Sequence, residues 1–243
     1  VSGPPGSAHY VAEVRPEDLQ VIETANDALI PPAAPAEDNR AGQVARLFEA
    51  SSPGVAEVDL MIVYTPAARQ WAEANGGVNN VIAQAMERAQ LSLDNSLTQM
   101  RLRLVRAAEI SYLETDNSVV DLVRLTASQT WNPWGDTFEG FPVRGYMDEV
   151  HGWRDSYGAD LVCLLTRTDD VGGVAWLLNN ASGEPRYGFS LVRIQQASWT
   201  YTLSHELGHN MGCGHHREQN SHPGPGLFPY SAGWRWVSGD GNR

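Results

Sequence analysis

The sequence predicts an α/β (α+β) fold in which helices flank a mixed β-sheet, preceded by a separate N-terminal segment. The composition is globular, with 42% hydrophobic and 19% charged residues among 243. From residue 57 onward, apolar runs of strand length alternate with apolar residues at helical spacing. Seven of the 14 prolines lie in the first 53 residues. We therefore expect residues 1–56 to form a linker or the remnant of a preceding segment.

Four elements are expected in the first half of the main unit. Residues 58–64 form an apolar run that predicts a buried strand, ended by a Thr-Pro pair. Apolar residues then recur at helical spacing over residues 78–97, and a second strand is expected over residues 102–112. A short helix follows up to residue 125, with Asn117 or Ser118 as its N-cap.

The second half predicts two helices that enclose three strands. Gly158 stands just past the first of these helices and suits a left-handed C-terminal cap. The order β-α-β-α-α-β-β-β-α is typical of a mixed sheet covered by helices. The expected ranges are 143–157 (helix), 161–165, 173–178 and 189–194 (strands) and 198–211 (helix).

Residues 130–142 show no periodicity, but they hold two of the eight tryptophans and two of the five phenylalanines. Two interpretations are open. The stretch is an insertion loop that packs its own aromatic side chains, or it forms the rim of a substrate groove.

The charge excludes several partners. The formal net charge is −12, from 17 Lys and Arg against 29 Asp and Glu. Such a surface repels nucleic acid and anionic membranes, and no apolar run is long enough to span a bilayer. The first residues lack a signal-peptide pattern, so we expect any targeting peptide to have been removed or to lie outside this chain. No pattern in the sequence indicates the oligomeric state.

The last predicted helix carries the chemistry, in the pattern H-E-x-x-H-x-x-G-x-x-H. His205 and His209 are four residues apart, so they share one helix face and can chelate one metal ion. Gly212 can adopt a positive φ and end the helix, which brings His215 back as a third ligand. Glu206 points beside the metal, where a general base belongs.

Three neutral imidazoles leave a fourth position open, which is typical of a catalytic zinc site. Zinc lowers the pKa of its bound water to roughly 7, and Glu206 takes the proton as that water attacks a carbonyl. A carboxylate as third ligand is disfavoured, because Glu218 and Asp240 lie in loop sequence. Cys213 is not needed as a ligand, since three histidines already fill the site.

The extended motif is the metzincin signature, and the chain resembles bacterial reprolysin-like (adamalysin-type) metallopeptidases over residues 57–237. Residues 58–68 resemble their opening strand, residues 147–162 their central helix and strand, and residues 172–176 their edge strand. The resemblance implies a zincin-type, metzincin-like catalytic domain over residues 57–243, with a five-stranded mixed sheet over the active-site helix. It implies a secreted, extracellular or periplasmic zinc metalloendopeptidase.

The same resemblance implies roles for residues. His205, His209 and His215 would hold one catalytic zinc ion, and Glu206 would be the base. A peptide substrate would add antiparallel to the edge strand. The backbone groups for this pairing would come from Gly173, Val174, Ala175 and Trp176. Calcium binding has no support in the sequence.

Two features depart from the family pattern. His216 stands where adamalysin-like proteins usually have Asp, and no methionine follows Met211. We therefore expect the chain to end before the Met-turn that underlies the zinc in metzincins. Residues 1–56 resemble the tail of a pro-segment, but no cysteine precedes Cys163, so a cysteine switch from this segment is impossible. Two states stay open for Cys163 and Cys213: they form a disulfide with each other, or both are buried free thiols.

The sequence therefore predicts a zinc-dependent endopeptidase that acts on protein or peptide substrates. Two alternatives remain beside it. One is a catalytically weak or inactive zinc-fold module that binds a protein partner. The other is a latent form, in which residues 1–56 occupy the cleft.

Overall fold

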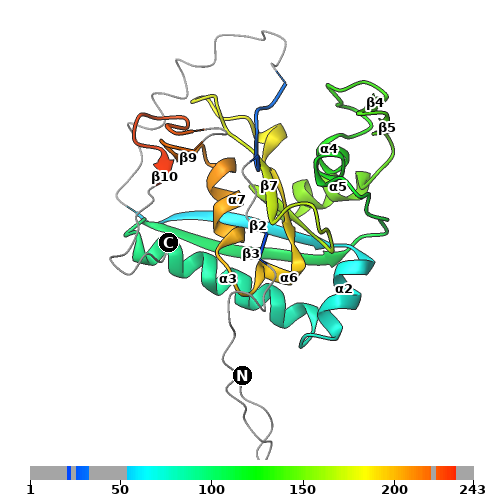
Figure 1. The fold of residues 1–243 in the computed structure, drawn as a ribbon, viewed down its shortest axis with the longest axis horizontal. Coiled ribbons are helices and arrows are strands. Elements are labelled where there is room, and N and C mark those ends of the chain that lie inside the picture. The colour runs from blue at the N-terminus through cyan, green and yellow to red at the C-terminus, as the bar shows by residue number, and fades with distance from the viewer. Residues whose placement is uncertain (1–20, 23–25, 33–53, 220–222, 234–243) are drawn as a thin grey trace, which may run out of the picture.

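The computed structural model describes residues 21–22, 26–32, 54–219 and 223–233. Most of the predicted N-terminal segment, and the residues after 233, lie outside these ranges. The described chain forms a mixed sheet with helices on both faces (Figure 1). This confirms the predicted α/β class.

The main sheet has six strands in the order β1-β7-β8-β6-β2-β3. Five of them are the predicted strands, and β7 is the antiparallel member, paired with β8. The sixth, β1, was not predicted and pairs parallel with β7. The other three pairings are parallel. The bounds are β1 (Ala28–Leu29), β2 (Ala56–Tyr64), β3 (Met100–Glu109), β6 (Leu161–Thr166), β7 (Gly173–Trp176) and β8 (Phe189–Arg193).

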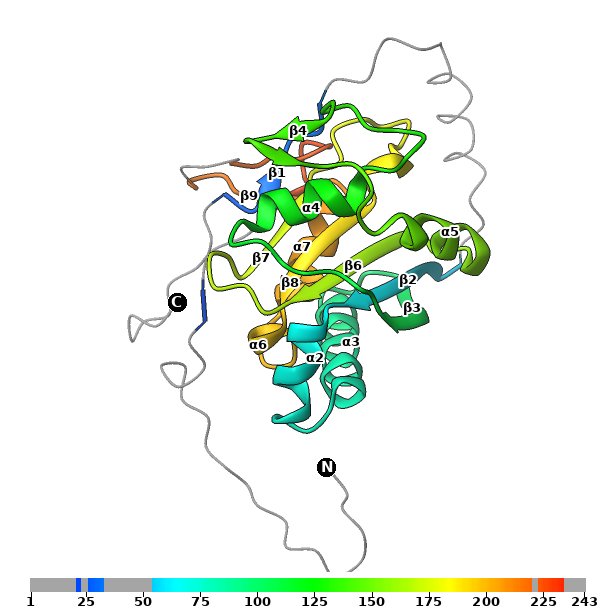
Figure 2. The same cartoon turned by 90° about the vertical axis from the view of Figure 1, so that its right-hand side faces the viewer.

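Two apolar clusters hold helices to the two faces of the sheet, as expected for strands whose side chains alternate between faces. One face packs against α2 (Pro66–Glu73), α3 (Val78–Asn95), α6 (Ile194–Ala197) and α7 (Thr202–Asn210). The other packs against α4 (Ser118–Thr126) and α5 (Asp148–Tyr157). Figure 2 shows α2 and α3 on one side of the strands and α4 on the other.

One helix was not predicted, one begins later than predicted, and one of two candidate N-caps is used. The Thr-Pro pair that was expected only to end β2 also begins α2: Thr65 Oγ1 accepts a hydrogen bond from Ala68 N at 3.0 Å, and Pro66 occupies the first turn. Helix α5 begins at Asp148, five residues later than expected, and ends at Gly158 with φ 63°. Of the two N-caps considered for α4, Asn117 is the one used.

The last predicted helix, 198–211, is shorter than expected. It begins at Thr202, and a separate short helix, α6, precedes it. The aromatic stretch 130–142 contains a small hairpin of β4 (Thr137–Phe138) and β5 (Phe141–Pro142). The remaining elements are η2 (Pro185–Tyr187), β9 (Gly214–His216) and β10 (Ala232–Gly233).

Among the described residues, no helix combines the length and the apolar character needed to cross a membrane.

Candidate metal centre

Helix α7 carries two histidines on one face and is fixed under the edge of the sheet. The Nε2 atoms of His205 and His209 are 3.0 Å apart, as the four-residue spacing predicts. Asn210, in the same last turn, is buried and donates from Nδ2 to the carbonyl oxygens of Trp176 (2.9 Å) and Phe189 (3.0 Å). Helix α7 is therefore held in place against both β7 and β8.

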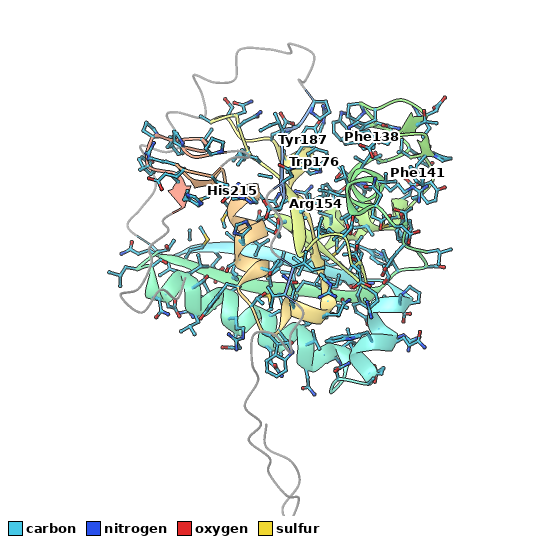
Figure 3. The ribbon with its side chains drawn as sticks, in the orientation of Figure 1. Phe138, Phe141, Arg154, Trp176, Tyr187 and His215 are labelled. Atoms are coloured by element: carbon cyan, nitrogen blue, oxygen red, sulfur yellow. The ribbon has the colours of Figure 1, made fainter. Side chains whose placement is uncertain are left out.

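The chain reverses at Gly212 and returns the third histidine to the same place. Gly212 has φ 89°, and a Cβ there would lie 2.7 Å from Leu227 Cβ, so both conformation and space require glycine. His215 then stands on β9, with its ring 4.7 Å from that of His209 and 5.4 Å from that of His205. All three predicted ligands are thus brought together (Figure 3 labels His215).

The three histidines have the chemistry of a zinc ligand set. His209 Nδ1 lies 2.8 Å from the carbonyl oxygen of Cys213, which places a proton on Nδ1 and leaves Nε2 as a donor of electrons. Burial lowers the pKa of His209, which also favours the neutral ring. Four nitrogens or oxygens bound to zinc at about 2.05 Å lie roughly 3.3 Å apart in a tetrahedron. The 3.0 Å between the two helix nitrogens agrees with that spacing.

A fourth side chain, Asp27, reaches the same point and was not predicted. Its carboxylate oxygens lie 2.7 Å from His215 Nε2 and 3.3 Å from His205 Nε2. Asp27 Oδ1 also lies 3.7 Å from His209 Nε2. One ligand atom from each of these four residues lies within 4.8 Å of the others, so together they can hold a metal ion.

The histidines affect the pKa of Asp27. Burial raises that pKa, but the close approach of His205, His209 and His215 outweighs burial and lowers it well below its usual value. Little in the sequence points to this contact, because residue 27 precedes the first of the histidines by nearly 180 positions. The visible feature is an acidic residue ahead of a short apolar run and a proline cluster, which by itself indicates only a linker.

Glu206, the predicted base, is buried in α7, next to His205 in the sequence. Its Oε2 has no hydrogen-bond partner within the described part of the chain. A Cβ on Gly173 would lie 2.4 Å from Glu206 Oε1, so the carboxyl group packs directly against the backbone of the edge strand. Burial raises the pKa of Glu206 well above its usual value, and the negative charge of Asp27 raises it further.

The predicted substrate-binding strand is already paired. All four residues of β7 are buried. Ala175 N donates to Asp27 O, and Leu177 N donates to Leu29 O, both at 2.8 Å. Residues 26–32, which we call the strap, therefore occupy the outer edge of β7.

An aromatic cluster borders the end of β7. We define it as Trp131, Trp134, Trp176 and Tyr187. The rings of Trp134 and Trp176 stack 5.4 Å apart, and Tyr187 meets Trp176 edge-on at 5.3 Å (Figure 3 labels Trp176 and Tyr187). The stretch 130–142 therefore packs its tryptophans against Trp176 and Tyr187, as the insertion-loop interpretation expects. The rim of a substrate groove stays a prediction.

The remaining predicted residues lie outside the ligand set. Cys163 is buried in β6 and Cys213 is exposed, and both are free thiols. Neither the disulfide nor the pair of buried thiols is present, because the turn at Gly212 directs Cys213 outward. His216 is half-buried, and its Nδ1 accepts from Glu218 N at 3.3 Å. Asp240 lies outside the described residues.

Curated proteins of similar sequence are named peptidyl-Asp metalloendopeptidases. A peptidyl-Asp metalloendopeptidase of Stenotrophomonas maltophilia is 25% identical over 99% of this chain and 52% of its own length. One from Pseudomonas aeruginosa is 29% identical over 76% of this chain and 30% of its own. The chain thus spans about half or less of these relatives. A solved structure, metalloproteinase-II from Bacteroides fragilis, is 17% identical over 79% of this chain and 53% of that one, with a TM-score of 0.38, too low to bear on this chain.

The family assignment rests on a family model that matches most of the chain. Residues 55–237 fit the model Reprolysin_5, described as metallo-peptidase family M12. That range includes the whole main sheet except β1, and all three histidines. The family implies a bound metal, and the cluster of His205, His209, His215 and Asp27 has suitable donors for one. This chain belongs to the reprolysin-type metallopeptidases of family M12.

Proposed function

We propose that this chain is a zinc-dependent endopeptidase in which Glu206 is the general base. The observation that supports this most strongly is the convergence of His205, His209 and His215, together with the buried Glu206 next to His205 on the same helix. A site that only held a metal would not need an unpaired buried carboxyl group, which is costly to keep. We propose His205, His209 and His215 as the zinc ligands.

The chemistry that zinc supplies when bound is that of a Lewis acid, which polarises a peptide carbonyl and makes water more acidic. The rest falls to residues of this chain. Glu206 accepts the proton of the attacking water and returns it to the leaving amine. Its contact with Gly173 fixes the carboxyl group beside the strand that presents the substrate. The peptide backbone pairs antiparallel with β7, which requires the strap to leave that edge.

For the substrate, we propose peptides or proteins that contain aspartate, as the names of the relatives suggest. We also propose an extracellular or periplasmic location, which the resemblance to bacterial reprolysin-like peptidases implies. Residues 57–243 would form the catalytic unit, and residues 1–56 a pro-segment remnant.

The experiment compares Glu206→Gln with its parent, the Asp27→Ala variant, and with Glu73→Gln, an exposed residue on α2. Each protein carries Asp27→Ala as well, so that the strap does not mask activity. We expect Glu206→Gln to keep one zinc per chain and to lose cleavage of an aspartate-containing peptide by about 10²–10⁴-fold, the usual contribution of a general base. Glu73→Gln should cleave normally.

Two results would contradict the proposal. Full cleavage by Glu206→Gln would remove Glu206 from the mechanism. Tight zinc binding without cleavage of any unfolded protein would favour a non-catalytic module that binds a partner.

A further inference from the structure

We propose that Asp27 is the fourth ligand of the metal and that the strap is a built-in inhibitor, which closes the cleft of the proposed peptidase. The inference rests on the proposed zinc site. It gives residues 26–32 an inhibitory function that depends on a carboxylate, and this function is separate from the three-histidine motif and from a cysteine switch.

The first step is the position of the carboxylate. Asp27 Oδ1 and Oδ2 face His215 Nε2 and His205 Nε2 at 2.7 and 3.3 Å, and the side chain is only 8% exposed. Zinc binds carboxylate oxygens at about 2.0–2.2 Å, nearly the same distance at which it binds imidazole nitrogens. Three histidines and one aspartate make a closed set of four, whereas catalysis needs the fourth position open.

The second step is the direction of the strap. It runs parallel to β7, with Ala28 opposite Ala175 and Leu29 opposite Trp176. A substrate that adds antiparallel runs the other way along the same edge. The strap therefore blocks the backbone groups that a substrate needs, but brings a side-chain carboxylate to the metal instead of a peptide carbonyl. It can be bound there without being cut.

The third step is anchorage on both sides of Asp27. Towards the N-terminus, Ile22 N donates to Gln196 Oε1 at 3.1 Å. Towards the C-terminus, Leu29 packs against the apolar core that includes the aromatic cluster. Tyr187 Oη donates to the carbonyl oxygen of Pro32 at 3.4 Å. These contacts fix Asp27 in register with the histidines.

The contacts are nevertheless few, since β1 is only two residues long. Such a short strand is weak alone, and its occupancy depends on the high effective concentration that the covalent connection provides. Loss of Asp27, or of that connection, should therefore open the cleft.

The first test reads the metal directly and needs no activity. Full-length protein is loaded with Co²⁺, and its visible absorption is recorded for the unchanged chain, Asp27→Ala, Asp27→Asn and Asn26→Ala. Asn26 is the exposed neighbour on the strap and serves as the matched control. We expect both Asp27 variants to change the absorption bands, and Asn26→Ala to leave them unchanged. Circular dichroism checks that each variant is folded.

Acetohydroxamate then probes whether the fourth position is open. It should bind Co²⁺ in Asp27→Ala roughly tenfold or more tightly than in the unchanged chain. Removing even a residue that only hydrogen-bonds a metal ligand changes metal affinity or activity by about tenfold or more. A synthetic peptide of residues 21–32 should compete with it, and the same peptide with Asp27→Asn should not. Identical spectra and equal hydroxamate affinity in both proteins would overturn the inference.

Peptide cleavage separates this inference from the proposed function. Asp27→Ala should cleave roughly tenfold or more faster than the unchanged chain, on the same scale. If both cleave equally fast, the inhibitory role is wrong and the peptidase stands. If Asp27 is a ligand and the variant admits hydroxamate, but no form cleaves any peptide, the inference stands and the proposed peptidase falls.

Discussion

Replacing Gly173 by alanine should disable the proposed base without touching the metal ligands. The new Cβ would lie 2.4 Å from Glu206 Oε1 and 2.7 Å from its Cγ and Cδ. Ordinary contact between such atoms needs about 3.5 Å, so the carboxyl group must move by roughly 1 Å. A displacement of that size costs on the order of 10²-fold in rate. We therefore expect kcat/KM to fall about 100-fold.

The assay measures cleavage of an aspartate-containing peptide in the Asp27→Ala background, together with zinc content. Gly152→Ala is the matched control, because a Cβ at that position on α5 meets nothing within 4 Å. The control should be as active as its parent, and both variants should bind one zinc ion. If Gly173→Ala kept full activity, the contact between the edge strand and Glu206 would have no role in catalysis.

Two further predictions concern packing around the site. Asn210→Ala leaves the buried carbonyl groups of Trp176 and Phe189 without their donor. Urea unfolding should show that the free energy of unfolding falls by about 1–3 kcal/mol. The control Asn75→Ala removes one exposed hydrogen bond and should cost far less. An equal loss in both would argue against this anchor. A thiol reagent at pH 8 should label only Cys213 in the folded protein, because burial raises the pKa of Cys163 to about 12 and shields it. Labelling of both thiols before unfolding would contradict the position of β6.

The local part of the site could be predicted from the sequence. The spacing of His205 and His209 sets their common face through the helix repeat alone, and Gly212 marks the turn that returns His215. The strand runs were equally visible, because buried parallel strands are continuously apolar. Helix α2 was missed because Thr65 and Pro66 end a strand and cap a helix at the same point.

The contact of Asp27 with the histidines could not be predicted in the same way. It depends on β1, a strand of two residues whose pairing with β7 is set by the tertiary fold and not by any periodicity. The carboxyl contact between Glu206 and Gly173 has the same character, since it joins two elements 33 positions apart. Short-range patterns predict which histidines can act as ligands, but whether Asp27 reaches them depends on long-range packing.

A crystal structure of the zinc-loaded, full-length chain with an anomalous difference map tests the central claim most directly. We expect one zinc ion bound by the Nε2 atoms of His205, His209 and His215 and by a carboxylate oxygen of Asp27, each at about 2.0–2.2 Å. Zinc bound elsewhere, or held by the histidines with water in the place of Asp27, would contradict it.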